Sequence, residues 1–251
     1  MKKDLTKALR NFQIEYPLNF TTWIIDHEGI PRPASLGGNC LFLAQKMRER
    51  FEGLGFSVST GLDGIHPALI VDDGRESYFV ESTILQETPI LMSAIGKTDP
   101  QHPMATPVLT QTKNRTHVIY VNRGAHASSV ETNYVYEGIE LHRASYDMRY
   151  PSTADNMRCL YNSHAVLAAH VRPLMMRLLE PDNSTIGITL HAQKDELSYR
   201  RVHRGGTERK QLMWESAEVE AIAKRVGLNP AELRYYFETS RSLLKDLLCD
   251  R

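Results

Sequence analysis

Apolar residues recur every three or four positions in several stretches of this chain, which is the spacing of an amphipathic helix. Leu5 and Leu9 share a face in the first stretch, and Leu43 and Met47 share one in the second. Pro173 is expected to kink or divide the helix predicted over residues 154–179. The pattern predicts helices over residues 4–15, 40–52, 154–179 and 217–226, and a last helix that Asn229 caps and Pro230 begins.

Runs rich in β-branched and aromatic residues predict strands between these helices, and clusters of Gly and Pro predict loops over residues 26–39 and 87–107. The strands are expected at residues 56–60, 67–71, 78–81, 116–121, 134–141, 185–190 and 196–202. This order of elements predicts an α+β fold. It has a helical N-terminal lobe (1–60), a central β-rich lobe (61–150) and a C-terminal part (151–251) with a helix and a small α/β lobe.

Composition narrows the class of partner. Lys and Arg together number 30, as do Asp and Glu, so no overall positive field favours nucleic acid or an anionic membrane. No apolar run has the form of a signal peptide or approaches the roughly 18 residues of a membrane helix. The three cysteines lack Cys-x-x-Cys spacing, which argues against a disulfide framework or a four-cysteine zinc site and predicts a cytoplasmic protein.

The segment Leu36-Gly37-Gly38-Asn39-Cys40 leads directly into the second predicted helix. A cysteine at a helix N-terminus lies in the positive field of the helix dipole, which favours the reactive thiolate. Backbone N–H groups at Gly38 and Asn39 could receive a developing oxyanion. The alternative is a buried structural cysteine that begins a core helix.

A histidine and a carboxylate flank the next predicted hairpin. Asp73-Gly74 between strand-like runs is typical of a two-residue type I′ turn, and that register places His66 directly opposite Glu81. Opposed side chains are close enough for a carboxylate–imidazole hydrogen bond, as a cysteine nucleophile requires. The alternative is a cross-strand pair without a catalytic role.

Other polar clusters are less specific. The ten histidines show no metal-ligand spacing, so no metal site is predicted. A basic glycine turn can hold phosphate, although such a run is more often a solvated loop. The candidate anion contacts are Lys113, Arg115 and Arg123 beside one strand and Arg204, Gly205 and Gly206 in a turn.

A cysteine at a helix start, a histidine on a strand and an acid on the next strand together resemble the transglutaminase-like, papain-like cysteine superfamily. Within it, the chain resembles a divergent arylamine N-acetyltransferase through a Gly-Gly-x-Cys segment, a His-x-Ala-Leu-x-Val strand and a Tyr-x-Val-acid strand. Glu81 stands where the family has Asp, which retains the carboxylate on a longer arm. The matching residues are Gly37, Gly38, Cys40, His66, Ala68, Leu69, Val71, Tyr78, Val80 and Glu81.

This resemblance implies a β-barrel-like central lobe, an α/β lid and a Cys40–His66–Glu81 triad. It also implies ping-pong transfer of an acyl group from a thioester to a small-molecule amine, as in biosynthetic amide formation. The donor would be acyl-CoA or a phosphopantetheine thioester on an acyl carrier protein, with no permanently bound cofactor. The alternatives are a cysteine peptidase or amidase on the same core, and a binding module that retains only the fold.

Overall fold

The computed structural model describes most of the chain as two compact units. The first unit comprises Met1–Gln13 and Cys40–Arg158, and the second comprises Ile14–Asn39 and Cys159–Arg251. The predicted division into lobes at residues 60 and 150 remains a prediction. The described residues are 2–64, 66–96, 104–112, 115–124, 129–136, 138–148, 153–161, 174–191 and 196–249.

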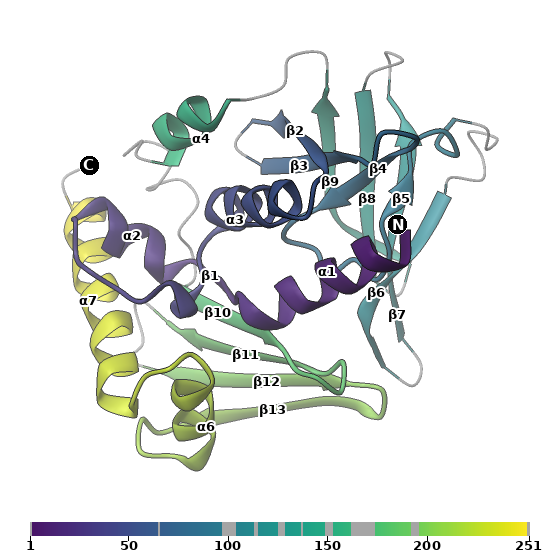
Figure 1. The fold of residues 1–251 in the computed structure, drawn as a ribbon. Coiled ribbons are helices and arrows are strands. Elements are labelled where there is room, and N and C mark those ends of the chain that lie inside the picture. The colour runs from purple at the N-terminus through teal and green to yellow at the C-terminus, as the bar shows by residue number, and fades with distance from the viewer. Residues whose placement is uncertain are drawn as a thin grey trace. The chain divides into compact units, whose positions relative to one another are not determined.

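The first unit contains an eight-stranded antiparallel sheet in the order β5-β4-β3-β2-β9-β8-β7-β6 (Figure 1). The segment between β4 and β5 hydrogen-bonds to the edge strand β6. Glu87 N donates to Pro107 O at 3.2 Å, and Leu85 O accepts from Leu109 N at 2.7 Å. The sheet is therefore nearly closed and barrel-like, as predicted. Its strands are β2 (Ser57–Asp63), β3 (His66–Asp72), β4 (Ser77–Glu81), β5 (Ile90–Leu91), β6 (Met104–Thr112), β7 (Arg115–Arg123), β8 (Ser129–Tyr136) and β9 (Ile139–Asp147).

Helix α3 (Cys40–Gly53) packs on β2 and β3 (Figure 1). It buries Leu43, Met47 and Phe51, so the predicted stripe is its core-facing side. At full burial, each such side chain stabilises the fold by about 1.5 to 3 kcal/mol. The other helices that reach this unit are α1 (Lys2–Glu15), whose last two residues belong to the second unit, and α4 (Ala154–Tyr161).

The second unit contains a five-stranded antiparallel sheet in the order β1-β10-β11-β12-β13. Helix α7 packs against α2, and both helices contact β10. The strands are β1 (Leu18–Asn19), β10 (Leu174–Leu179), β11 (Thr185–Leu190), β12 (Leu197–His203) and β13 (Gly206–Leu212), and the helices are α2 (Thr21–His27), α6 (Ala217–Arg225) and α7 (Pro230–Cys249), with a 3₁₀ turn η1 (Ala34–Leu36).

Four predicted elements were wrong in part. Residues 134–141 form the facing ends of β8 and β9, because Gly138 turns the chain with a φ of 78°. Of the predicted helix over 154–179, the described residues form α4 (Ala154–Tyr161) and strand β10 (Leu174–Leu179), which is paired with β11, and Pro173 lies outside them. The predicted loop 26–39 contains the end of α2 and the turn η1, and the predicted loop 87–107 contains β5 and the start of β6.

In the described ranges, no helix combines the length and the apolar character needed to cross a membrane.

The two helices that follow β13 begin with different caps. At α7, Asn229 Oδ1 accepts from Glu232 N at 2.9 Å, and Glu232 Oε2 accepts from Asn229 N at 2.8 Å. This reciprocal pair is a capping box. At α6, Ser216 occupies the cap position without a side-chain hydrogen bond to the helix.

Asn229→Ala should therefore lower the free energy of unfolding by about 1 kcal/mol, because it removes one of these cap bonds. Ser216→Ala is the matched control and should cost less than half as much. Urea denaturation followed by circular dichroism measures both. Equal losses would contradict this account of the caps.

Candidate active site

Cys40 is the first residue of α3, and its side chain is 5% exposed. The buried stripe of α3 fixes this helix end against β2 and β3. Because the N–H groups of a first helical turn lack intrahelical partners, they favour negative charge at this position. The fold thus places the Cys40 sulfur at the positive end of the α3 dipole.

The loop before Cys40 requires glycine at position 37. Gly37 has a φ of 76° and a ψ of −153°, a conformation that is essentially restricted to glycine. A Cβ at this position would lie 2.0 Å from the carbonyl oxygen of Pro17. Gly38 N donates to the same oxygen at 3.1 Å. The predicted oxyanion role of Gly38 would compete with this bond, whereas that of Asn39 remains a prediction.

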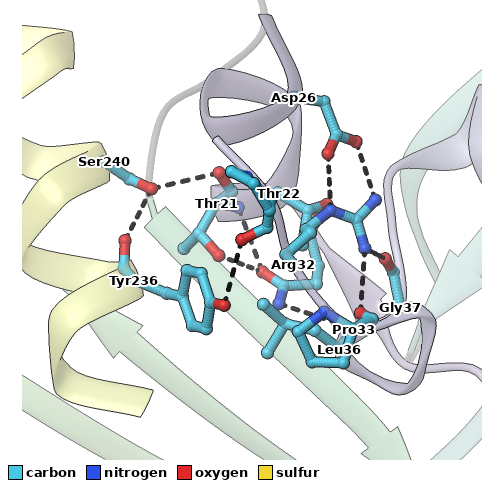
Figure 2. Close-up of polar contacts among 11 residues, drawn as sticks. Thr21, Thr22, Asp26, Arg32, Pro33, Leu36, Gly37, Tyr236 and Ser240 are labelled. Atoms are coloured by element: carbon cyan, nitrogen blue, oxygen red, sulfur yellow. Dashed lines mark hydrogen bonds and ion pairs between the residues drawn. The ribbon is translucent and has the colours of Figure 1, made fainter. Parts of the chain in front are cut away.

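Two buried polar side chains of the second unit hold this loop in shape (Figure 2). Arg32 donates from Nε and Nη2 to the two carboxylate oxygens of Asp26, at 2.6 and 2.7 Å, and from Nη1 to Gly37 O at 2.7 Å. Asn19 Nδ2 donates to Leu36 O at 2.9 Å. No sequence pattern indicated this network, because its members follow no helix or strand spacing.

The predicted two-residue turn between β3 and β4 was wrong. The turn has four residues, 73–76, and Glu81 pairs with Ala68 rather than with His66. Asp73 Oδ1 accepts from the backbone N–H groups of Arg75 and Glu76, at 2.9 and 2.8 Å. These side-chain bonds stabilise the longer turn over the type I′ alternative.

The register therefore differs from the prediction by two residues, and this shift preserves the face of the sheet. His66 lies two residues before Ala68 on β3, so His66 and Glu81 are diagonal neighbours on one face. Such neighbours are farther apart than opposed residues but remain within reach of a long side chain. His66 Nε2 lies 3.0 Å from Glu81 Oε1.

Glu81 is fully buried, and its carboxylate is surrounded by donors. Oε1 accepts from Thr83 N at 3.0 Å and from Thr83 Oγ1 at 2.6 Å, and Oε2 accepts from Ile84 N at 2.6 Å. Burial by itself would raise the pKa of Glu81. The hydrogen bond and charge of His66, together with the bonds from Thr83, outweigh burial and lower this pKa.

His66 interacts with both Cys40 and Glu81. Burial opposes its charged form, but hydrogen bonds to Cys40 and Glu81 and attraction to their negative charges raise the pKa of His66 to about 10. Nε2 faces Glu81 and also lies 3.1 Å from Thr83 Oγ1. This leaves Nδ1 as the nitrogen for the thiol. The geometry favours an imidazolium at His66, hydrogen-bonded to the Glu81 carboxylate and to Cys40.

Further residues that the sequence did not indicate surround this centre. Gln86 is fully buried, and its Oε1 accepts from Glu81 N at 2.9 Å while its Nε2 donates to Thr88 O at 2.7 Å. The ring centroid of Tyr146 lies 6.2 Å from that of His66. Burial, and then the charge of Glu81, raise the pKa of Tyr146 and keep its hydroxyl protonated.

The predicted phosphate contacts belong to both units: residues 113, 115 and 123 to the first and residues 204–206 to the second. Arg204 and Gly205 form the exposed turn between β12 and β13, and Gly206 begins β13. Arg123 donates to the backbone oxygens of Ile95 and Met92, at 3.0 and 2.9 Å. Lys113 and the side chain of Arg115 lie outside the described residues. In the part of the chain that the structure describes, no three His, Cys, Asp or Glu side chains are grouped to hold a metal ion.

The sequence matches no protein-family model and no curated protein. Solved structures, however, match nearly the whole chain. The arylamine N-acetyltransferase from Salmonella typhimurium has a TM-score of 0.64 at 13% identity, covering 95% of this chain and 92% of that one. The chain has the arylamine N-acetyltransferase fold.

Two mycobacterial enzymes show the same likeness. The arylamine N-acetyltransferase of M. tuberculosis has a TM-score of 0.63 at 14% identity, covering 96% of this chain and 93% of that one. That of Mycobacterium marinum, solved in complex with CoA, has a TM-score of 0.63 at 15% identity, with coverages of 96% and 92%. The arylamine N-acetyltransferase fold is thus retained here at very low sequence identity.

Glu81→Gln should lower the pKa of His66 from about 10 toward its ordinary value of 6.5, because the carboxylate charge is lost. In the wild type, the stability that His66 contributes should be complete below pH 6.5 and lost as the pH rises through about 10. Titration of the His66 ring by NMR measures the pKa, and unfolding at several pH values measures the stability.

Asp63→Asn is the matched control, because Asp63 lies directly opposite His66 across β2 and β3. This change should leave the His66 titration nearly unaltered. A His66 titration that responds equally to both substitutions would contradict a specific role for Glu81.

Proposed function

We propose that this protein is a cysteine-dependent N-acyltransferase that moves an acyl group from a thioester to an amine. The observation that carries the proposal is the placement of His66 between Cys40 and the buried carboxylate of Glu81. A nucleophile, a base and a group that orients the base are the parts that acyl transfer through a cysteine requires.

In the first half-reaction, the Cys40 thiolate attacks the thioester carbonyl and forms a new C–S bond. The carbonyl oxygen becomes an oxyanion, which backbone N–H groups near Asn39 and Cys40 would stabilise. As the intermediate collapses, the original C–S bond breaks. The departing thiolate takes the proton of His66 and leaves as a thiol, so that Cys40 carries the acyl group.

In the second half-reaction, an amine attacks the acyl-enzyme. His66, now neutral, removes the proton of the attacking nitrogen and becomes imidazolium again. The bond to the Cys40 sulfur breaks, and the amide departs while the thiolate is restored. Glu81 keeps its charge throughout and stabilises the imidazolium that forms in each cycle.

Acyl-CoA is the proposed donor, and a solved structure of the same fold with CoA bound supports this choice. A phosphopantetheine thioester on an acyl carrier protein would present the same reactive group. The proposed acceptor is a small-molecule amine, as in biosynthetic amide formation, and the proposed location is the cytoplasm.

Incubation with a panel of short acyl-CoA thioesters should add the mass of one acyl group to the wild-type protein, as measured by intact-mass spectrometry. Cys40→Ala should remove this increment, because the nucleophile is lost. Cys159→Ala is the matched control: Cys159 is an exposed thiol, and its loss should leave the acylation unchanged.

Addition of an amine to the isolated acyl-enzyme should then release an amide. Release of the free acid alone, at a rate independent of the amine, would favour a hydrolase over a transferase. An acyl increment that persists in Cys40→Ala would exclude Cys40 as the nucleophile.

A further inference from the structure

One face of the second unit's sheet carries a line of arginines. Arg177 on β10 pairs with Gly187 on β11, Gly187 pairs with Arg200 on β12, and Arg200 pairs with Arg209 on β13. Directly opposed residues of an antiparallel sheet share a face. These four positions therefore form one row across four strands, here called the arginine row.

The spacing of the row follows from sheet geometry. Arg200 and Arg209 are directly opposed, so their Cα atoms are about 4.5 to 5.5 Å apart. Arg177 lies two strands from Arg200, at about 10 Å. Gly187 separates these two and has no side chain, so the row has a gap at Gly187 with an arginine residue on each neighbouring strand.

The face of the row contains no carboxylate within these strands. The neighbouring positions on this face, two residues along each strand, are Met175, Leu179, Thr185, Thr189, Ser198, Val202, Thr207 and Gln211. The acidic residue of these strands is Glu208, which pairs with Arg201 on the opposite face. Arg200 and Arg209 are exposed, and no ion pair joins either of them to a described acidic side chain.

The opposite face shows the usual pattern. There Arg201 donates to Asp182 at 3.1 Å, and Lys210 is paired with Glu218 of α6. Leu178, Ile186 and Tyr199 of that face line a cavity together with Ala221 and Ile222 of α6. Arg201 and Lys210 on the helix-covered face thus have acidic partners, whereas Arg200 and Arg209 have none among the described residues.

Like charges placed directly opposite each other destabilise a sheet, and a bound anion removes this repulsion. The planar guanidinium group matches phosphate oxygens in bidentate geometry. We propose that the arginine row binds the phosphate groups of a multiply phosphorylated adenine nucleotide. The choice of ligand rests on the proposed function, since the nucleotide half of CoA carries a 3′-phosphate and a diphosphate.

The probe is adenosine 3′,5′-bisphosphate, titrated calorimetrically into the wild type, the double variant Arg200→Gln/Arg209→Gln and Arg201→Gln. The double variant should bind the probe at least about tenfold more weakly, because it loses two charged donors. Arg201→Gln removes a cation from the same strand on the opposite face, and its affinity should stay within about twofold of the wild type. Melting temperatures confirm that all three proteins are folded.

Wild-type affinity in the double variant, or no binding to the wild type at millimolar probe, would overturn the proposal. Acylation by an N-acetylcysteamine thioester, which has no phosphate, is measured on the same proteins and should be equal in all of them. If the wild type is not acylated, the proposed function fails while the binding result stands. If acylation proceeds but the probe binds all three proteins equally, only the arginine row fails.

Discussion

The buried carboxylate of Glu81 is the constraint on which the rest of the site depends. A fully buried charge is tolerated only when hydrogen bonds and an opposite charge compensate for its lost hydration. Thr83 and Ile84 supply backbone N–H groups at the end of β4, and His66 supplies the positive charge. One carboxylate therefore fixes the turn after its own strand and the charge of the imidazole beside Cys40.

The same requirement explains the length of the side chain. Because Glu81 pairs with Ala68, its carboxylate must reach diagonally to a histidine two residues away. The small Ala68 side chain leaves room for that path. Asp63 is directly opposite His66 on β2, yet Glu81 makes the hydrogen bond, so position in the sheet alone does not select the partner.

Much of this arrangement could be predicted from the sequence. The helix that Cys40 begins, the strand that His66 begins and the cap that Asn229 forms on the last helix follow from local patterns, and the structure shows all three. The hairpin register did not follow, since Asp73 stabilises a longer turn through its own side chain. The face was nevertheless right, because the shift was even.

Other features depend on contacts between residues that are distant in sequence, so they could not be predicted from the local sequence pattern. Residues 174–179 are rich in Leu and Met, which suit a helix, but pairing with β11 and the burial of Leu174, Met176 and Leu178 make them a strand. Likewise, the opposition of Arg200 and Arg209 follows from the register of β12 and β13. Glycine at position 37 proved to be required by the nearby Pro17 carbonyl.

The central claim is that His66, charged through Glu81, activates Cys40 as a nucleophile. The most direct measurement is the rate of Cys40 alkylation by iodoacetamide at pH 7, resolved by peptide mass spectrometry, in the wild type, Glu81→Gln and Asp63→Asn. We expect Glu81→Gln to react at least about tenfold more slowly than the wild type, because His66 loses the carboxylate that holds it, and Asp63→Asn to react at the wild-type rate. Equal rates in all three proteins would contradict the claim.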